Sequence, residues 1–297
     1  MIEFTKISPK DKEIFDSFYQ YKIIKNCETA FANLCAWSFV LNGEYAIIDG
    51  TLITRVHYEL NKEVCYHCPI GPGNRVDIIK KLIEDSKENS YKMNMMIDCN
   101  DEFKLNFPDR FKIVEKREYF DYVYLRESLS TLSGKKLQAK RNHVNRFSKK
   151  YNYEYLEINS SNINLCIEFA ERWLLENAKF HPESIEGYNE ELKVIKYFAD
   201  NFDALAIIAG AILVEGDMVA FTLGSKVNNE TFCTHIEKAN TSFDGAYAMI
   251  NKEFSIRLPG MYIYVNREED LGLEGLRKAK LSYQPIELIH KTLATLL

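Results

Sequence analysis

One order of predicted elements occurs twice in this 297-residue chain, and the duplication limits the fold more than any single motif does. In each half, hydrophobic periodicity predicts helices, then three short strands, a glycine-containing loop, a further helix and a last strand. Equivalent landmarks keep nearly the same offset: Gly50 and Gly216 are 166 residues apart, and Met93 and Met261 are 168 apart. We therefore expect two copies of one unit that combines helices with a mainly antiparallel sheet.

Turn and capping residues set the expected boundaries. Ser8 is a typical N-cap, and Pro9 suits the first position of a helix. In the first half we predict helices at 9–22, 29–38 and 75–88 and strands at 44–48, 51–57, 63–67 and 93–98. In the second half we predict helices at 134–150, 163–178 and 245–257 and strands at 204–213, 217–225, 230–238 and 261–266. The predicted domains are residues 1–130 and 131–297.

This order of elements is that of the GNAT acyltransferase fold. The expected fold class is therefore α/β (α+β), with two tandem GNAT-like domains, each a mixed, mainly antiparallel sheet flanked by helices. In that fold, the loop before the helix that follows the three strands holds an anion on free backbone N–H groups. Gly245 lies in such a loop and is a candidate substrate-binding residue. Ser242 and Tyr247 stand where coenzyme A users are expected to have Arg or Gln and Gly or Ala, which disfavours acetyl-CoA as the donor.

One basic segment departs from the net charge of −5. Residues 128–153 contain no Asp or Glu but seven Lys and Arg residues. Apolar residues recur within 134–150 at the spacing of an amphipathic helix, so one edge should be buried and the cations exposed. The helix is predicted to neutralise phosphates of tRNA or of a lipid headgroup. The candidates are Lys136, Lys140, Arg141 and Arg146; the alternative is a solvated basic face that pairs with acids elsewhere.

The seven cysteines are expected to be free thiols packed as small apolar groups. Cys65 and Cys68 form a CxxC pair with His67 between them, and His57 lies nearby. A zinc site would need a second compact ligand pair, and only Cys99 is available. We therefore predict no metal site.

The composition, 46% hydrophobic and 27% charged, is typical of a folded globular protein. No run of about 18 apolar residues is present, so no transmembrane segment is expected. The N-terminus lacks the basic start and apolar stretch of a signal peptide. We predict a cytoplasmic location, with peripheral membrane contact as an option.

The strand at 230–238 carries the candidate catalytic residues. Because side chains alternate along a strand, Cys233, His235 and Glu237 are predicted to share one face. A histidine and a carboxylate on one face can deprotonate or orient an attacking amine, which makes Glu237 or His235 the candidate base. The alternative is a hydrogen-bonded pair that lines a partly buried sheet. Lys238, at the end of this strand, is a candidate substrate-binding residue.

Polar residues also follow the neighbouring strand. Carboxylates at this position could hold the α-ammonium of an aminoacyl group, and a guanidinium could hold a carboxylate or phosphate in a bidentate manner. The alternative is a charged loop with internal ion pairs. Asp121, Tyr122 and Tyr124, in a strand that leads to the basic helix, are interpreted as structural or interdomain. The candidate substrate-binding residues are Asn266, Arg267, Glu268 and Asp270, with Arg277 and Lys280 on the last helix.

The last helix also carries a family resemblance. Residues 275–285 read Gly-Leu-Arg-Lys-Ala-Lys-Leu-Ser-Tyr-Gln-Pro. This stretch resembles the Gly-Leu-Arg-Lys-Phe-Lys…Phe-x-Pro motif in the C-terminal domain of phosphatidylglycerol lysyltransferases. The whole chain resembles an uncharacterised bacterial family related to that domain. The further matching stretches are 31–37, 69–71, 140–147, 235–239 and 264–268.

The resemblance implies a tandem GNAT architecture related to Fem-type peptidyltransferases. It further implies transfer of an aminoacyl group from aminoacyl-tRNA to an amine or a lipid hydroxyl, with a small molecule, peptide or lipid as acceptor and no firmly implied cofactor. One alternative is an acyl-CoA-dependent N-acyltransferase, and another is a catalytically silent protein that binds RNA or a membrane surface. No serine nucleophile elbow, Walker A loop or dinucleotide fingerprint occurs in the sequence.

Overall fold

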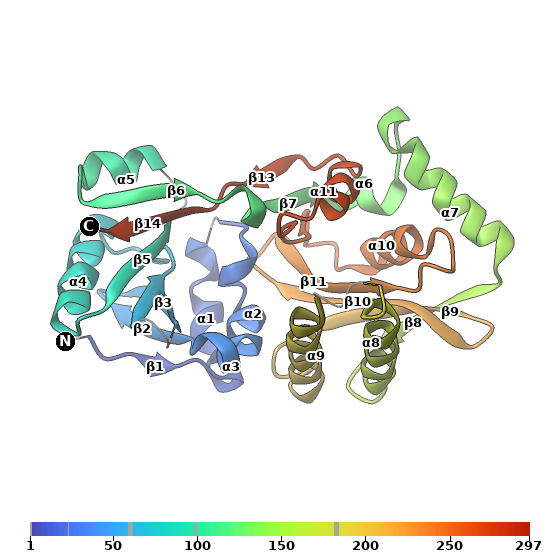
Figure 1. Cartoon of the computed structure of the whole chain (residues 1–297), viewed down its shortest axis with the longest axis horizontal. Helices are drawn as coiled ribbons and strands as arrows, with labels where there is room; N and C mark the ends of the chain where they lie inside the picture. Colours follow the sequence, from blue (N-terminus) through green and yellow to red (C-terminus); the bar gives the residue numbers. More distant parts are fainter. Residues whose placement is uncertain (1, 23, 59–61, 98–99, 181–183) are drawn as a thin grey trace.

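The computed structural model describes residues 2–22, 24–58, 62–97, 100–180 and 184–297 (Figure 1). Two seven-stranded sheets follow one another along the long axis of the molecule, and helices flank both. This mixed architecture agrees with the predicted α+β class. No described helix has the length and apolar character needed to cross a membrane.

The first sheet has the strand order β1-β2-β3-β4-β5-β14-β6. Its strands are β1 (Thr5–Lys6), β2 (Glu44–Ile48), β3 (Thr51–Tyr58), β4 (Glu63–Tyr66), β5 (Lys92–Ile97), β6 (Phe111–Glu115) and β14 (Thr292–Leu296). Strands β4 and β5 are parallel, and the other neighbours are antiparallel.

The second sheet has the order β13-β7-β12-β11-β10-β9-β8. Its strands are β7 (Asp121–Leu125), β8 (Tyr153–Ile158), β9 (Ile208–Val214), β10 (Asp217–Lys226), β11 (Thr231–Ala239), β12 (Tyr264–Asn266) and β13 (Glu287–Ile289). Here β11 and β12 are the parallel pair, and the other neighbours are antiparallel.

The helices connect the strands and cover the sheets. They are α1 (Lys12–Ser17), α2 (Phe31–Ala36), α3 (Ser38–Leu41), α4 (Arg75–Glu88), α5 (Asn100–Asn106), α6 (Arg126–Thr131), α7 (Gln138–Lys150), α8 (Asn164–Asn177), α9 (Ile185–Asp200), α10 (Ala246–Arg257) and α11 (Glu274–Leu281). The described 3₁₀ helices are η1 (Pro9–Asp11), η2 (Tyr19–Tyr21), η3 (Cys27–Thr29), η5 (Arg117–Tyr119) and η6 (Lys135–Leu137). Helix α4 joins the parallel pair of the first sheet and α10 joins that of the second, so the predicted duplication is present in the topology.

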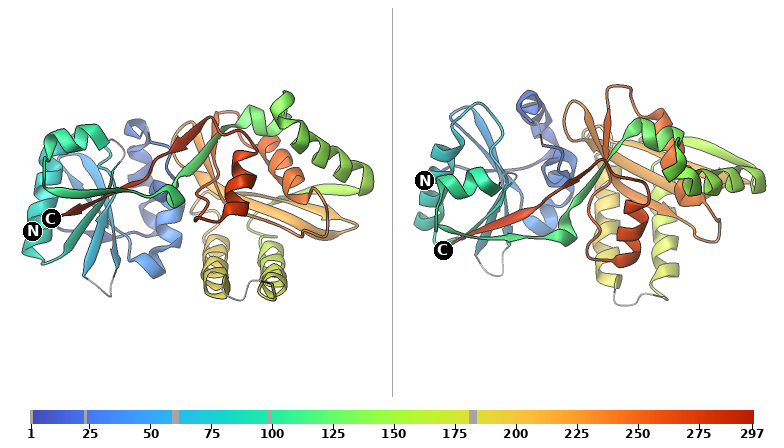
Figure 2. Two further views of the ribbon diagram at one scale, coloured as in Figure 1. Left: turned by 45° about the horizontal axis from the view of Figure 1, so that its top comes forward. Right: turned by 90° about the horizontal axis from the view of Figure 1, so that it is seen from above.

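The two sheets exchange strands. The chain leaves the first sheet after β6, enters the second as β7, and returns from β13 as β14, which lies between β5 and β6. The two connections run side by side (Figure 2), and Lys116 N donates to Lys291 O at 2.9 Å. The division into domains 1–130 and 131–297 stays a prediction. Strand β7 lies before that boundary but pairs in the second sheet, and β14 lies after it but pairs in the first.

One hydrophobic core spans both halves. Phe15 of α1 and Phe31 of α2 belong to the same buried cluster as Phe169 of α8 and Phe198 of α9. The rings of Phe15 and Phe31 have centroids 4.7 Å apart. Each fully buried ring of this kind stabilises the fold by about 1.5–3 kcal/mol. The halves are therefore packed against each other, which fixes the residues at their junction.

Several predicted boundaries agree with the structure and others differ. The strand at 44–48 and the helix at 75–88 occur as predicted. The predicted helix 9–22 is divided into η1, α1 and η2, and 29–38 into η3, α2 and α3. The strand predicted at 204–213 begins only at Ile208, because a turn in which Ala206 has a φ of 51° precedes it. The last residue of the predicted strand 93–98 lies outside the described residues.

Candidate functional site

The last residue of β12 and the loop after it contain four of the predicted site residues, and α11 holds this loop in place. Asp270 is fully buried and accepts two hydrogen bonds of 2.9 Å from Arg277, one from Nε and one from Nη2. Tyr122 donates to Asp270 Oδ2 at 2.6 Å and Arg117 at 3.1 Å. Burial alone would raise the pKa of Asp270, but the hydrogen bonds from Arg277 and Tyr122 hold it below its usual range. Asp270 and Arg277, both predicted to bind substrate, therefore bind each other.

Lys280 fixes the backbone of the same loop. Its buried ammonium donates to the carbonyl oxygens of Arg267 and Glu269, each at 2.5 Å. The carbonyl of Lys280 accepts a hydrogen bond of 2.8 Å from Tyr124. Burial lowers the pKa of Lys280, and the nearby charge of Arg267 lowers it further. Lys280 was predicted to bind substrate, but its donors are engaged by the loop.

The backbone turn at Glu268 directs the neighbouring side chains of Arg267 and Glu268 to different partners on β11. Glu268 has a φ of 56°, a left-handed conformation that costs a non-glycine residue about 1 kcal/mol. Its N–H donates to Asn266 Oδ1 at 2.7 Å, which stabilises the turn. Arg267 then reaches Glu237 of β11, while Glu268 reaches His235 of the same strand. Strained residues of this kind concentrate at functional sites.

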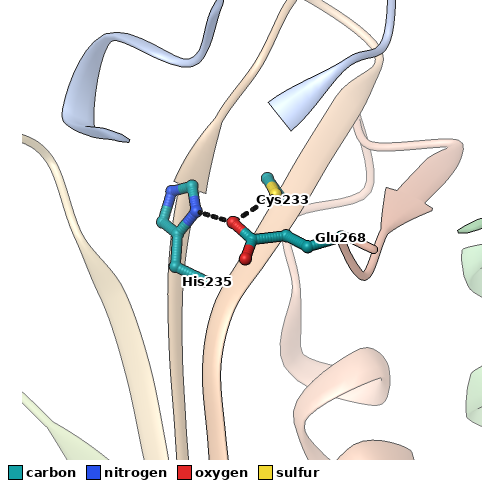
Figure 3. Close-up of side chains that lie close together, drawn as sticks. All are labelled: Cys233, His235 and Glu268. Carbon is teal, nitrogen blue, oxygen red and sulfur yellow. Dashed lines mark hydrogen bonds and ion pairs between the residues drawn. The ribbon is translucent and has the colours of Figure 1, made fainter. Parts of the chain in front are cut away.

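His235 is held from both ring nitrogens. Nδ1 lies 2.9 Å from Glu268 Oε1, and Nε2 lies 2.7 Å from Ser225 Oγ of β10. Cys233 Sγ lies 3.6 Å from the same Glu268 oxygen, so the thiol and the imidazole both point at one carboxylate atom (Figure 3). Asn33 of α2 donates to that oxygen at 3.0 Å. Burial would raise the pKa of Glu268, but the hydrogen bond and charge of His235 lower it, so the carboxylate is ionised near neutral pH.

Ser225, His235 and Glu268 have the hydrogen-bond order of a nucleophilic triad, with a hydroxyl on one ring nitrogen and a carboxylate on the other. Ser225 is 2% exposed, and so is the side chain of His235. An ester substrate has no access to such a hydroxyl in this conformation. The serine therefore orients the imidazole and is not placed as a nucleophile.

The predicted common face of His235 and Glu237 is wrong, because β11 contains a bulge. The register pairs Thr234 with Gly224 and Ile236 with Leu223, which leaves His235 without an opposite residue. His235 stacks on Phe198 of α9, with ring centroids 5.4 Å apart. Glu237 instead contacts Asn251 of α10, on the opposite face of the sheet. The two candidate bases consequently belong to separate clusters.

Glu237 and Arg267 form the centre of the second cluster. Arg267 Nη2 donates to Glu237 Oε1 at 2.6 Å, and Asn251 Nδ2 donates to Glu237 Oε2 at 3.3 Å. The guanidinium carbon of Arg267 lies 4.8 Å from the ring centroid of Tyr283. Lys140 of α7 places Nζ 4.2 Å from the same centroid. Burial lowers the pKa of Lys140, and repulsion from Arg267 adds to this effect.

Two buried polar atoms of this cluster have no hydrogen-bond partner among the described residues: Nη1 of Arg267 and Oδ1 of Asn251. A buried polar atom without a partner costs about 1–3 kcal/mol. Both residues already hold Glu237 with their other atom. The cluster can therefore still donate one hydrogen bond from a cation and accept one at an amide oxygen.

A third cluster lies where the strands cross between the sheets. Asp121, the first residue of β7, accepts hydrogen bonds from Cys27 N at 2.8 Å and from Asn266 Nδ2 at 2.8 Å, and pairs with Lys291 Nζ at 2.7 Å. Glu28 also pairs with Lys291. Burial would lower the pKa of Lys291, but Asp121 and the other acids hold it well above its usual value. Asp121 was predicted to be structural or interdomain, and its contacts agree with a structural role. Cys27 and Lys291 were not predicted, because no local pattern marks them.

The family model described as "Phosphatidylglycerol lysyltransferase, C-terminal" matches residues 22–295. The chain belongs to this family. A conserved protein of unknown function from Bacteroides thetaiotaomicron is 42% identical, and its structure matches over 100% of both chains with a TM-score of 0.94. An uncharacterised protein of Mycoplasmoides gallisepticum is 26% identical over 178 residues, which are 58% of this chain and 55% of that protein. The matched part thus spans about half of that relative.

Two more distant solved structures have the same overall fold as this chain. L-PGS from Bacillus licheniformis is 15% identical, with a TM-score of 0.65 over 98% of this chain and 92% of that chain. The tandem GNAT protein of the clavulanic acid biosynthesis pathway is 8% identical, with a TM-score of 0.54 over 99% and 98%. The predicted tandem GNAT fold and the predicted relation to lysyltransferases are confirmed. At the general level, family and fold support a transferase.

In this member of the family, the four predicted phosphate-binding cations differ in their environment. Lys136 is exposed. Lys140 turns toward Tyr283, as described above. Arg141 donates to the carbonyls of Leu132 and Gly134, which ties α7 to the preceding turn. Arg146 pairs with Asp244 at 3.1 Å on the exposed surface. Phosphate binding by this helix stays a prediction.

Lys238 and Gly245 have local structural partners. Lys238 pairs with Glu191 at 2.6 Å, and its Nζ lies 3.8 Å from the ring centroid of Trp173, on the side of α8 and α9. Gly245 has a φ of 93°, and a Cβ there would lie 2.7 Å from the carbonyl oxygen of His143. Helix α7 thus packs directly on the residue before α10. Substrate binding by either residue stays a prediction.

The CxxC pair is packed among the strands. Cys65 is buried, and Cys68 Sγ donates to the carbonyl of Met96 at 3.3 Å. His67 is buried beside Thr54, and burial lowers the pKa of His67 to about 4. Cys99 lies outside the described residues. Within the described ranges, neither Cys65 nor Cys68 belongs to a group of three converging metal-ligand side chains.

Proposed function

We propose that this chain is an aminoacyltransferase that takes its acyl group from aminoacyl-tRNA and transfers it to an amine or a lipid hydroxyl. Membership of the phosphatidylglycerol lysyltransferase C-terminal family supports the reaction class. Aminoacyl-tRNA as donor places the reaction in the cytoplasm. A lipid acceptor would require peripheral contact with a membrane surface.

The cluster around Glu237 and Arg267 is the proposed site of transfer. The observation that carries this assignment is the buried Arg267: its Nη1 has no partner in the part of the chain that the structure describes, while its Nη2 holds Glu237. A preorganised cationic N–H is suited to stabilise the oxyanion that forms when the acceptor attacks the aminoacyl ester. The Arg267 and Glu237 side chains are 11% and 12% exposed, and Nη1 of Arg267 is buried, so the pair is shielded from bulk water.

Glu237 is the better supported of the two predicted bases. It would take the proton from the attacking amine or hydroxyl as the new acyl bond forms. The ester bond to the tRNA ribose then breaks, and the proton passes to the leaving oxygen. His235 is less suited to this role, because both of its ring nitrogens are engaged and its side chain is 2% exposed.

Lys140 and the surface cations of α7 are proposed to hold the donor. Lys140 lies beside Arg267 and Tyr283 and could contact a phosphate at the acyl-bearing end of tRNA. Lys136 is exposed, and the Arg146–Asp244 pair is exposed as well, so phosphate can replace Asp244 at little cost. Phosphate binding is therefore proposed for Lys136, Lys140 and Arg146.

The test is a filter assay with a mixture of radiolabelled aminoacyl-tRNAs that follows tRNA binding and transfer of label into lipid, peptide and small-amine fractions. Glu237→Gln keeps the shape of the side chain and one acceptor oxygen for Arg267, but it removes the base, and its NH2 group cannot accept the hydrogen bond from Asn251 Nδ2. We expect transfer to fall by about 10²–10⁴-fold with tRNA binding retained. The matched control is Glu157→Gln, an exposed carboxylate on β8 of the same sheet, which should leave transfer unchanged.

Each other outcome has a definite meaning. Full transfer by Glu237→Gln would exclude Glu237 as the base. Binding of tRNA by the wild-type protein without transfer into any fraction would favour an RNA-binding protein without catalysis. If the wild-type protein shows no tRNA binding and no transfer, aminoacyl-tRNA is excluded as the donor. Stabilisation by acyl-CoA would then favour the acyl-CoA-dependent alternative.

A further inference from the structure

We propose that Cys233, His235 and Glu268 form a zinc-binding site at the junction of the two halves. The three side chains offer a thiolate, an imidazole and a carboxylate, and their ligand atoms all lie within 4.8 Å of one another. This donor set is characteristic of zinc among the common divalent ions, because calcium and magnesium prefer oxygen ligands alone. The proposal does not depend on the proposed aminoacyl transfer.

Two of the three distances between the donor atoms are close to those around a tetrahedral ion. Zinc bonds of about 2.3 Å to sulfur and about 2.0–2.2 Å to nitrogen and oxygen place neighbouring ligand atoms about 3.3–3.6 Å apart. Cys233 Sγ and Glu268 Oε1 are 3.6 Å apart, and His235 Nδ1 and Glu268 Oε1 are 2.9 Å apart. A shift of a few tenths of an ångström in the carboxylate of Glu268 would therefore admit the ion. In Figure 3 the imidazole and the thiol converge on that carboxylate from one strand.

Outer partners hold two of the three ligands. Ser225 Oγ lies 2.7 Å from His235 Nε2. A hydroxyl can donate or accept, so Ser225 can accept the Nε2 proton when Nδ1 coordinates a metal. Asn33 donates to the Glu268 carboxylate at 3.0 Å. Hydrogen bonds of this kind orient ligands in natural metal sites and raise their affinity.

The local backbone explains why the three ligands meet. Cys233 and His235 are two apart on β11, so they project to the same side, and the bulge begins only at His235. Glu268 enters from the left-handed turn after β12, the parallel neighbour of β11. The strained turn and the bulge both contribute a ligand, which gives each irregularity a role.

A neighbouring group of possible ligands is less suited to a metal. Cys27, Asp121 and Glu269 also converge. The ammonium of Lys291 already lies 2.7 Å from Asp121 Oδ1 and 3.4 Å from Cys27 Sγ. A divalent ion there would have to displace a buried cation from its partners. We therefore assign zinc to the Cys233 cluster, where three protein ligands leave a fourth position for a water molecule or another small donor.

The experiment uses the full chain, treated with a chelator and then titrated with cobalt(II) as a spectroscopic substitute for zinc. We expect one equivalent to bind, with a thiolate-to-cobalt charge-transfer band and the intense visible bands of four-coordinate cobalt, both removed by added zinc. Because this measurement is made on the wild-type protein, it does not depend on the folding of any variant. A folded wild-type chain that shows no such bands would overturn the proposal.

The variants locate the site. Cys233→Ser should abolish the charge-transfer band, and Ser225→Ala should weaken zinc binding by about 10–100-fold, as measured by competition with a chromophoric chelator. Cys27→Ser is the matched control from the neighbouring group and should retain the band. Retention of the band in Cys233→Ser, or its loss in Cys27→Ser alone, would assign the metal elsewhere and refute the proposal. Circular dichroism of each variant reports whether it is folded.

Discussion

Arg267 donates to Glu237 across 2.6 Å through one terminal nitrogen, while its other terminal nitrogen is buried without a hydrogen-bond partner within the described ranges. Such an arrangement is costly for a purely structural ion pair, because an unpaired buried donor destabilises the fold by about 1–3 kcal/mol. It is useful if a substrate oxygen becomes the missing partner. The predictions below separate this role from the structural roles of the surrounding residues.

Arg267→Lys should reduce aminoacyl transfer more than it reduces stability. A lysine ammonium can still pair with Glu237, but it cannot present a second N–H in the fixed geometry of a guanidinium. We expect transfer to fall by about 10²–10³-fold, the usual effect of losing one oxyanion donor. The measurement is the single-turnover rate with aminoacyl-tRNA. Arg257→Lys, at an exposed arginine that pairs with Glu253, is the control and should have the wild-type rate.

Asp121→Asn should destabilise the protein by about 3 kcal/mol, because it removes one of the anionic partners of the buried ammonium of Lys291 while Glu28 remains beside it. The free energy of unfolding in urea measures this effect. Glu287→Gln removes the exposed partner of Lys25 instead, and it should cost less than about 1 kcal/mol. Equal effects of the two substitutions would contradict the interpretation that Asp121 joins the two halves.

Gly245→Ala should destabilise the protein by at least about 2 kcal/mol. The residue has a φ of 93°, and the added Cβ would lie 2.7 Å from the carbonyl oxygen of His143. The matched control is Gly260→Ala, where a Cβ meets nothing within 4 Å and φ is not in the left-handed region. The melting temperatures of the two variants are compared by thermal unfolding. Similar melting temperatures would show that α7 can shift to accommodate the added Cβ with little loss of stability.

Lys22 should make stability depend on pH in the alkaline range. Its buried ammonium donates to Thr29 O at 2.6 Å, and burial lowers its pKa from 10.5 to about 7, against the opposing effect of Cys233 and Cys27. Between these two pKa values the unfolded chain binds a proton that the folded chain does not, so stability rises with pH. Below about pH 7 both states are protonated and the dependence vanishes.

The measurement for Lys22 is the difference in unfolding free energy between the wild type and Lys22→Met at several pH values between about 7 and 10. The difference should shift in favour of the wild type by up to about 1.4 kcal/mol per pH unit. Taking the difference between the two proteins cancels the contributions that other groups titrating in this range make to the unfolding free energy. Lys193→Met, at an exposed lysine of α9, should give a flat profile. A flat profile for Lys22→Met as well would mean that Lys22 is protonated in the folded protein.

Local sequence patterns predicted the elements that depend on local interactions. The helix at 75–88 occurs as predicted, since its apolar spacing and its N-cap, Asn74, are contained in the segment itself. The motif at 275–285 was correctly linked to the family. Arg277 and Lys280 were predicted to reach a substrate; in the structure they hold Asp270 and the loop backbone, and substrate binding stays a prediction. Long polar side chains have the same appearance in sequence whether they bind a ligand or a neighbouring loop.

The candidate sites depended on contacts that a linear pattern does not contain. The bulge at His235 arises from the register between β11 and β10, and one unpaired residue was enough to send Glu237 to the opposite face. Lys291 and Asp121 meet although 170 residues separate them. Nothing in the sequence indicated this pairing, because pairing of buried charges is decided by which strands become neighbours.

The sequence by itself determined the duplicated order of elements, the two-sheet class and the family, because periodicity, turn residues and motifs are read within short windows. Only the tertiary structure decided that the sheets exchange strands, that His235 and Glu237 serve separate clusters, and that Cys233, His235 and Glu268 converge. The physical reason is that these outcomes follow from strand register and burial. Both arise from the packing of the whole chain, where a shift of one residue changes the face and the partners of every side chain that follows.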